Sequence, residues 1–338
     1  MTGWSRRWRG PWLSTADDHD PDPGIRSHAR RRGAIRESAG LVLVLGVLVA
    51  LFSITSDHFL SRVTFTTLAN QLPALAVIVV GMTLVLIAGG IDLSVGSVMA
   101  LGAAVLGVTL TRWHWPVPLA LAACVGVGVL AGLVNGLVTV RWSIPSFIVT
   151  LGMLEVARGG AYVATDSRSV FVGSALDGVG APLSGLGVSP AFLVAVLLVV
   201  AGQVLLTRTV FGRYVVAIGT NREAVRLSGI ATAPVEVAVF ALSGALAGLA
   251  GIFHVAYLES VDPNAGIGLE LSAIAAVVIG GTSLMGGRGS VVASFVGVLI
   301  IVVLQAGLAQ VGATEPTKRI VTGLVIIAAV IIDAWRRR

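Results

Sequence analysis

The feature that most constrains this chain is a series of long apolar stretches that carry no charged residue. The clearest examples are residues 41–54, 72–88, 119–140, 291–311 and 320–332. A helix needs ~20 apolar residues to cross the ~30 Å hydrocarbon core of a bilayer, and these stretches approach or reach that length. Charged residues make up only 12% of the 338 residues, against about a quarter in soluble domains. The stretches are therefore predicted to span a membrane.

Hydrophobicity along the chain predicts an all-α fold, a polytopic transmembrane bundle of about ten membrane-embedded segments. We place these segments near residues 39–56, 73–90, 94–111, 117–140, 146–165, 191–206, 236–257, 269–283, 291–312 and 317–333. Residues 1–36 form an arginine-rich tail with too little apolar content to fold alone, so we expect this tail to be disordered. The transmembrane domain then covers residues 37–335, and residues 336–338 form a short tail.

The distribution of basic residues predicts the orientation. If the chain starts in the cytoplasm, alternation of the segments places both tails, the turn at Arg141, the loop 207–235 and the turn at Arg288 on the cytoplasmic side. Those regions hold most of the 23 lysine and arginine residues, as the positive-inside rule requires. We therefore expect a multi-pass protein of the cell (inner or plasma) membrane with both termini in the cytoplasm. No cleavage pattern follows the first apolar stretch, so it is expected to stay as an anchor.

Small residues are abundant and point to close helix packing. The chain has 42 glycines, which would weaken helices in water but let transmembrane helices approach backbone to backbone. The single cysteine, Cys124, lies inside an apolar stretch. It is predicted to be a small buried hydrophobe, and no disulfide framework or metal cluster is expected.

Two segments interrupt the apolar pattern, residues 88–97 and residues 279–290. Each contains a glycine pair, and these pairs are Gly89, Gly90, Gly280 and Gly281. One reading is a broken helix whose unwound backbone lines a transport pathway, which is tolerated where protein or water satisfies the backbone. The other reading is a tight cytoplasmic turn between adjacent spans. The sequence leaves both open.

Asp92 is the strongest single candidate for a functional residue. An ionised carboxylate near the bilayer centre costs at least ~2.5 kcal/mol and usually persists only beside water, a partner or a helix N-terminus. Asp92 could contact a substrate, together with Ser94, or it could cap the helix that follows. The sequence is compatible with both interpretations.

Four amide side chains lie in or beside the apolar segments, and each could bind hydroxyl groups or tie helices together. They are Asn70, Gln71, Asn135 and Gln203. We expect helix ties for most of them, and we include Asn70 and Asn135 with Asp92 and Ser94 as candidate pathway residues. Glu155 and Arg158 are one helical turn apart, so a local ion pair is the default expectation.

A polar stretch near residues 208–234 is predicted to form a short cytoplasmic helix. Asn221 could cap a helix that runs to Leu227, and Gly229 could end it. A rigid element of this kind could be pushed by a soluble partner. It could equally be a loop helix that lies on the lipid headgroups.

Catalytic signatures are absent from the sequence. It contains no H-E-x-x-H or G-x-S-x-G motif, and its five histidines are scattered, so no enzyme activity, metal or cofactor is expected. It also lacks a G-x-x-x-x-G-K-[ST] phosphate-binding loop, since its only lysine, Lys318, follows Thr317. If ATP drives this protein, another chain must bind the nucleotide.

Taken together, four blocks of sequence resemble the permease subunits of ATP-binding cassette (ABC) importers for ribose, xylose, galactose and related monosaccharides. The blocks are residues 81–97, 144–152 with 158–159, 208–230 and 266–290. Two departures are Leu269, where tyrosine is usual, and Val225, where alanine is usual. The first puts a sugar-stacking role at position 269 in doubt.

The resemblance implies a permease that passes a small sugar inward by alternating access. It further implies a homodimer with the pathway at its centre, an extracytoplasmic sugar-binding protein, and a cytoplasmic ATPase with paired nucleotide sites. The ATPase would dock on the loop 207–235, at positions that include Gly219, Asn221, Glu223 and Gly229. No nucleic acid partner is expected.

Three other functions compete with this one. A related ABC permease for branched-chain amino acids or nucleosides shares the architecture, but residues 90–96 favour the sugar type. A secondary transporter driven by an ion gradient should carry ionisable groups in several spans, whereas Asp92 and Glu155 are nearly alone here. A membrane-embedded enzyme is the third, and the missing motifs count against it.

Overall fold

The computed structural model describes residues 40–336, apart from some side chains towards the end of the last helix. The predicted disordered tail, residues 1–36, lies outside the described residues. The elements that follow the first helix, Gly40–Thr55, are α2 (Arg62–Ile87), α3 (Val95–Thr111), α4 (Val117–Trp142), α5 (Ser146–Thr165), β1 (Val170–Phe171), η1 (Gly173–Leu176), α6 (Asp177–Gly180), α7 (Pro190–Arg208), α8 (Val210–Leu227), α9 (Thr232–Leu258), β2 (Ser260–Val261), α10 (Leu269–Ile279), α11 (Val291–Gln310) and α12 (Glu315–Arg336).

The prediction of a mainly helical chain is confirmed, and a helix occupies most of each predicted segment. Six of the described helices are long and apolar enough to cross a membrane, namely α2, α4, α5, α7, α9 and α11. The first helix, α3 and α10 are apolar but shorter. The only strands in the described part of the chain are β1 and β2, an antiparallel pair of two residues each, which the sequence did not predict.

The start of the second predicted segment is wrong by about three helical turns. Helix α2 begins at Arg62 rather than near residue 73, and Pro73 lies inside it. Polar residues between positions 62 and 72 interrupt the apolar pattern, so the sequence did not predict this part of the helix. Ser61 caps the helix by accepting a hydrogen bond from the Thr64 amide, and Gln310 donates to the Thr64 hydroxyl at 2.8 Å.

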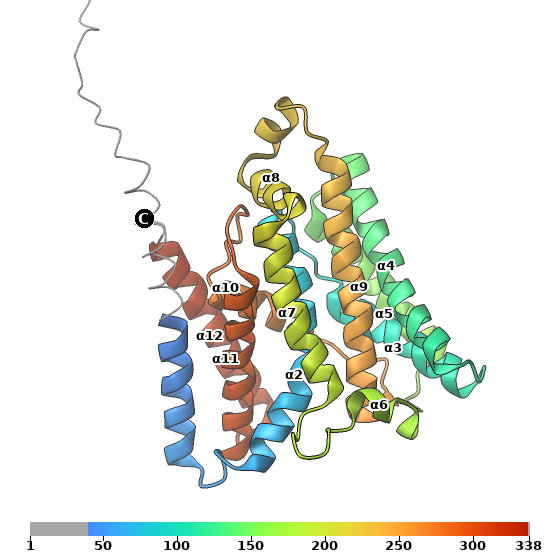
Figure 1. Cartoon of the computed structure of the whole chain (residues 1–338), viewed down its shortest axis with the longest axis vertical. Helices are drawn as coiled ribbons and strands as arrows, with labels where there is room; N and C mark the ends of the chain where they lie inside the picture. Colours follow the sequence, from blue (N-terminus) through green and yellow to red (C-terminus); the bar gives the residue numbers. More distant parts are fainter. Residues whose placement is uncertain (1–39, 337–338) are drawn as a thin grey trace, which may run out of the picture. The chain divides into compact units, whose positions relative to one another are not determined.

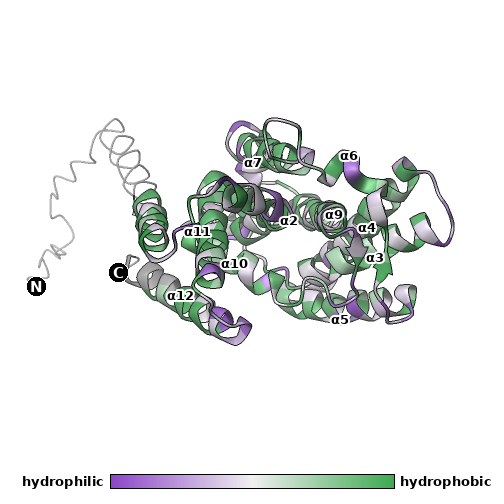
Figure 2. Cartoon of the chain, turned by 90° about the horizontal axis from the view of Figure 1, so that it is seen from below, coloured by the Kyte–Doolittle hydropathy of each residue, from purple (hydrophilic) through white to green (hydrophobic). Residues whose placement is uncertain are grey.

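Helix α2 lies at the centre of the bundle, as the end-on view in Figure 2 shows. It packs against α9, α7 and α11, and its second half is buried almost without interruption. Its fully buried side chains include Met82, Leu84, Leu86 and Ile87. Outer helices instead expose large apolar side chains, for example Leu130 on α4 and Val163 on α5. Apolar outer faces suit helices that are surrounded by lipid.

Helices α4 and α9 make the most extensive helix contact in the described part of the chain. A Cβ atom on Gly128 would collide with the carbonyl oxygen of Gly244, and one on Gly132 would collide with that of Phe240. These glycines repeat every four residues and therefore share one face of α4. The predicted role of glycine in helix packing is confirmed at this interface, where Cys124 is also buried and its thiol contacts the Gly248 carbonyl at 3.1 Å.

The connecting segments gather at two opposite ends of the bundle. Helix α8 lies at one end and α6 at the other (Figure 1). The α8 end also contains the 88–94 segment and the 280–290 loop, since Gly219 of α8 lies against both.

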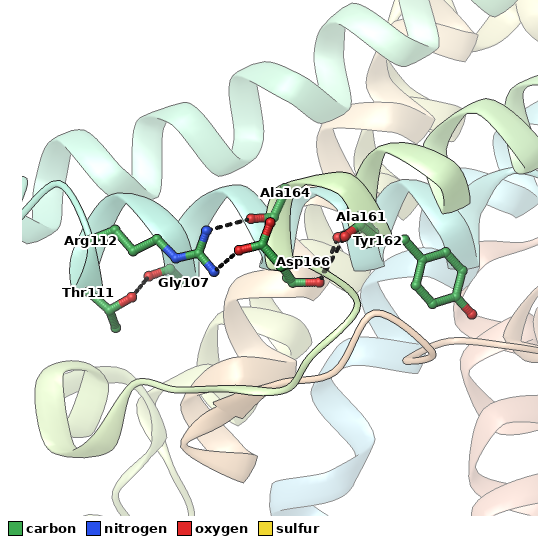
Figure 3. Close-up of polar contacts among 8 residues, drawn as sticks. Gly107, Thr111, Arg112, Ala161, Tyr162, Ala164 and Asp166 are labelled. Carbon is green, nitrogen blue, oxygen red and sulfur yellow. Dashed lines mark hydrogen bonds and ion pairs between the residues drawn. The ribbon is translucent and has the colours of Figure 1, made fainter.

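An exposed ion pair lies at the α6 end. Arg112, which follows α3, pairs with Asp166, which follows α5, at 2.8 Å, and it also donates to the Ala164 carbonyl oxygen at 3.4 Å. Figure 3 shows this guanidinium reaching from the end of α3 to the end of α5. The contact fastens two helices that follow the first interruption.

Candidate functional site

Asp92 lies in the non-helical segment between α2 and α3 and is only 1% exposed. Its Oδ1 atom accepts hydrogen bonds from the Ser94 amide at 3.0 Å and from the Ser94 hydroxyl at 2.7 Å. Its Oδ2 atom accepts from the Ser243 hydroxyl of α9 at 2.9 Å. Both carboxylate oxygens thus have donors, which offsets the cost of burying the group.

Asn135 extends this network to α4. Its side-chain amide donates to the Ser94 hydroxyl oxygen at 3.0 Å, and Asn135 is also 1% exposed. The Asp92 network, defined as Asp92, Ser94, Asn135 and Ser243, therefore joins the interrupted segment to α4 and α9. Three of its four members are candidates from the sequence, and Ser243 is new.

The backbone of the interrupted segment is satisfied by side chains of α5. The Ile91 amide donates to the Ser146 hydroxyl at 2.9 Å and the Leu93 amide donates to the Thr150 hydroxyl at 3.0 Å. Ser146 and Thr150 are four residues apart, so they lie on one face of α5. Side chains of α5 thus satisfy two backbone amides of the unwound segment, in which Asp92 and Ser94 are buried.

Sequence reasoning missed Ser146, Thr150 and Ser243 as individual residues. A signal existed for the first two, because they lie four residues apart in one of the four blocks that carry the resemblance. Ser243 stands alone in an apolar stretch of α9, and nothing in the sequence connects it to Asp92.

The two interruptions end their preceding helices in the same way. At the end of α2, Gly89 has a φ of +86° and the Gly90 amide donates to the Val85 carbonyl oxygen at 2.9 Å. At the end of α10, Gly281 has a φ of +80° and the Thr282 amide donates to the Val277 carbonyl oxygen at 3.1 Å. Each is a left-handed glycine stop of the Schellman type.

The other glycine of each pair is needed for packing instead. A Cβ atom on Gly280 would lie 2.6 Å from the Ser294 Cα atom, and one on Gly90 would lie 3.0 Å from the Phe240 ring. The first glycine is the left-handed residue in one pair and the second glycine in the other pair. The two segments therefore match in geometry with a shift of one residue.

Asn70 is far from the Asp92 network in the fold. Its side chain accepts a hydrogen bond from the Ser189 amide at 2.8 Å and donates to the Gly187 carbonyl oxygen at 3.4 Å. It thereby ties α2 to the start of α7, at the α6 end. Gln71 and Gln203 also join separate elements, through Tyr257 and Ser290 respectively.

The expected ion pair between Glu155 and Arg158 does not occur among the described ion pairs, so that prediction is wrong. The Arg158 guanidinium instead donates to the carbonyl oxygens of Pro263 and Ala265, at 2.6 and 2.7 Å. Helical spacing alone did not reveal these acceptors, because they come from a loop more than 100 residues later. Arg158 holds that loop against α5.

Helix α8 has the predicted cap and stop. It is kinked at Asn221, whose φ and ψ are −159° and 94°, and the Asn221 side chain accepts a hydrogen bond from the Ala224 amide at 3.0 Å. Gly229 has a φ of +80° and the Ile230 amide bonds back to the Val225 carbonyl oxygen at 3.4 Å. The sequence prediction of a helix from Asn221 to Leu227, ended by Gly229, is confirmed.

Ion pairs on α8 differ in their surroundings. Glu223 pairs with Arg226 within the helix at 2.7 Å, and both side chains are exposed. Arg222 pairs with Glu236 of α9 at 2.6 Å and thus fastens α8 to the next helix. The Arg222–Glu236 pair borders a cavity of about 250 Å³ that Gly89, Gly90 and Phe240 also line.

Comparison with known proteins gives the family. Residues 64–330 match the family described as branched-chain amino acid transport system / permease component. This range includes both interruptions, the Asp92 network and α8. No solved structure matches the chain.

Individual relatives are similar over most of their length. The ribose import permease protein RbsC of Escherichia coli strain K12 is 37% identical over 310 residues, which cover 88% of this chain and 94% of the relative. The fructose import permease protein FrcC of Rhizobium meliloti is 35% identical, with 88% and 85% covered. The L-arabinose ABC transporter permease protein AraH of Azospirillum brasilense is 36% identical, with 94% of each covered.

The match and the fold agree with each other. The ribose and fructose relatives are named as import permease proteins, and six described helices could cross a membrane. The chain is a membrane protein that belongs to the family of branched-chain amino acid transport system / permease components.

Proposed function

We propose that this chain is the permease subunit of an ABC importer that carries a small sugar into the cell. The observation that carries the proposal is the similarity to ribose, fructose and L-arabinose permeases over most of the chain. The 88–94 segment supports it, because an unwound segment with a buried carboxylate is typical of a transport pathway.

The proposed partners are those of an ABC import system, which the similarity to an L-arabinose ABC transporter permease supports. A separate cytoplasmic ATPase with paired nucleotide sites supplies the energy, and an extracytoplasmic binding protein delivers the sugar. Two copies of the chain form a homodimer around the pathway. The ATPase docks on α8, where Glu223 and Gly229 are exposed.

The membrane topology in this proposal has ten embedded segments and both termini in the cytoplasm. The α8 end of the bundle faces the cytoplasm, and the α6 end faces outwards. Arginines at the α8 end support this orientation, since Arg141, Arg208, Arg213, Arg222 and Arg226 lie in or beside its helices and turns.

Asp92, Ser94 and Asn135 act in this proposal by holding the interrupted segment in the pathway. Because they are almost fully buried, substrate contact would require the segment to move during transport. Asn70 acts at the opposite end, where it holds α2 against the loop before α7.

A branched-chain amino acid is the second candidate cargo, because the family description names that substrate class. Uptake competition separates the two. Cells that contain this permease with its ATPase and binding protein are given labelled ribose, and unlabelled pentoses, hexoses or leucine are added in excess. Competition by sugars and none by leucine is expected. Competition by leucine alone would overturn the sugar assignment.

A further inference from the structure

Backbone atoms of three segments lie in close contact at the α8 end of the bundle. The segments are the end of α2 at Ile87, Gly219 of α8, and the loop between α10 and α11 at Gly287. The Gly287 amide donates to the Ile87 carbonyl oxygen at 2.8 Å. A Cβ atom on Gly219 would collide with that same oxygen and would lie 2.7 Å from the Gly287 nitrogen.

The reverse contacts are equally close. A Cβ atom on Gly286 would lie 2.7 Å from the Gly219 carbonyl oxygen and 3.1 Å from the Gly89 Cα atom. One on Gly287 would lie 3.1 Å from the Thr220 Cα atom. We call Gly89, Gly219, Gly286 and Gly287 the glycine junction. A side chain at Gly219, Gly286 or Gly287 would force the segments apart.

The junction is continuous with both interruptions. Gly89 leads into the segment that carries Asp92. Gly287 belongs to a loop closed by a hydrogen bond from the Ser283 amide to the Arg288 carbonyl oxygen at 2.9 Å, and Thr282 of this loop is fully buried. A displacement of Gly219 would therefore reach both interruptions at once.

The surroundings permit such a displacement. Gly219 lies two residues before the kink at Asn221, so it is next to the part of α8 on which the ATPase is proposed to dock. The cavity of about 250 Å³ lies next to Gly89 and Gly90, which leaves space into which the interrupted segment can move. Backbone contacts have no side-chain rotamers to absorb a shift, and tightly packed contacts pass small shifts on.

We infer that the glycine junction is the positioning element that passes movement of α8 to both interrupted segments, and so couples ATP hydrolysis to sugar movement. This inference rests on the proposed function, because it requires an ATPase that moves α8. The inference assigns to Gly219 the transmission of movement from α8. Docking of the ATPase does not require this role, because Glu223 and Gly229 are exposed on α8 and after its end.

The test uses the complete complex in lipid vesicles, with ATP hydrolysis and labelled sugar uptake measured together. Gly219→Ala is expected to lower the number of sugars carried per ATP by about tenfold, a size typical of coupling through a connected network. ATP hydrolysis is measured in the same vesicles, and it should fall by less than sugar uptake does. Gly126→Ala is the matched control, since a Cβ atom there meets nothing within 4 Å.

A second variant keeps the test decisive if the Gly219→Ala protein fails to assemble. Thr220→Ala trims the side chain that packs against Gly287 and adds no atom, so it should fold and lower the same ratio by about threefold. Normal coupling in Thr220→Ala, together with normal coupling or no assembly in Gly219→Ala, would overturn the inference. So would equal losses of hydrolysis and uptake, because those indicate structural damage alone.

The wild-type complex separates this inference from the proposed function. If it shows no ATP-dependent sugar uptake, the proposed function fails and the inference fails with it. If it transports sugar and both variants keep the normal ratio of sugar to ATP, only the glycine junction loses its role.

Discussion

Three hydrogen-bond donors converge on the Asp92 carboxylate, two from Ser94 and one from Ser243. A buried donor that loses its acceptor costs about 1–3 kcal/mol, more than an intact hydrogen bond contributes. The network therefore stabilises the non-helical backbone only as long as an acceptor stands at position 92. This makes Asp92 the residue on which the first interruption depends most.

Asp92→Leu should impair transport and lower the thermal unfolding midpoint of the purified protein. Three donors lose their acceptor, so the loss of stability should be about 3 kcal/mol or more. Thermal unfolding in detergent, followed by reaction of a thiol dye with the buried Cys124, measures the midpoint. Labelled sugar uptake at matched expression measures transport.

Asp92→Asn is the control, because it keeps one acceptor oxygen of nearly the same shape. It should fall between wild type and Asp92→Leu in stability. An unchanged midpoint and normal uptake in Asp92→Leu would show that this carboxylate is incidental.

Individual site residues could be predicted from the sequence only where a charged or amide side chain stands in an otherwise apolar stretch. Asp92 was found because a carboxylate is rare in an apolar stretch, and Asn135 because an amide is. Ser146, Thr150 and Ser243 were missed, since hydroxyl groups are common in apolar helices and their partners are set by tertiary packing. Arg158 was found but paired wrongly for the same reason.

At the scale of elements, the contact between α4 and α9 is governed by glycine. Lipid provides no hydrophobic drive for two apolar helices to associate, so close van der Waals contact must provide it. Gly128 and Gly132 allow that contact because the facing backbone lies where a side chain would be. Cys124 reports on this interface, as it is the only cysteine in the sequence.

Gly128→Val should separate α4 from α9 and destabilise the fold by roughly 1–3 kcal/mol, the usual cost of overpacking. The thiol of Cys124 should then react with dye at a lower temperature than in wild type. Gly126→Val lies on the same helix, where a Cβ atom meets nothing within 4 Å, and it should change little. Equal unfolding midpoints for the two variants would contradict the packing role.

Gly229 follows the end of helix α8, and it has a left-handed backbone and open space around it. Gly229→Val should strain the helix end by about 1–2 kcal/mol and uncouple ATP hydrolysis from uptake without preventing membrane insertion. Gly229→Asn is the control, because asparagine tolerates this conformation. Uptake at the wild-type level in Gly229→Val would count against a docking role for this part of α8.

Most elements could be predicted because their local signals are strong. Apolar runs located the helices, and Asn221 with Gly229 located the ends of the short helix in α8. The first part of α2 was not predicted, because Thr64, Asn70 and other polar residues interrupt the apolar pattern there. In the fold, these residues form hydrogen bonds with partners at distant positions. The glycine junction could not be predicted, since it joins residues from three separate parts of the chain.

At the scale of the whole molecule, the orientation can be tested by labelling. Ser228→Cys lies at the α8 end and Ser184→Cys at the α6 end, and both positions are exposed. Cys124 is buried, so it should give little background. A membrane-impermeant maleimide should label Ser228→Cys only in inside-out vesicles and Ser184→Cys only in intact cells. The reverse pattern would contradict cytoplasmic docking on α8.

The central claim is that this chain forms a pathway that moves sugar only with the help of a separate ATPase. The most direct measurement is uptake of labelled ribose and related sugars into vesicles that contain the purified chain, with the ATPase, the binding protein or ATP omitted in turn. The account predicts uptake from the complete mixture and none when any of the three is left out. Sustained uptake by the chain alone, or uptake driven by an ion gradient, would contradict it.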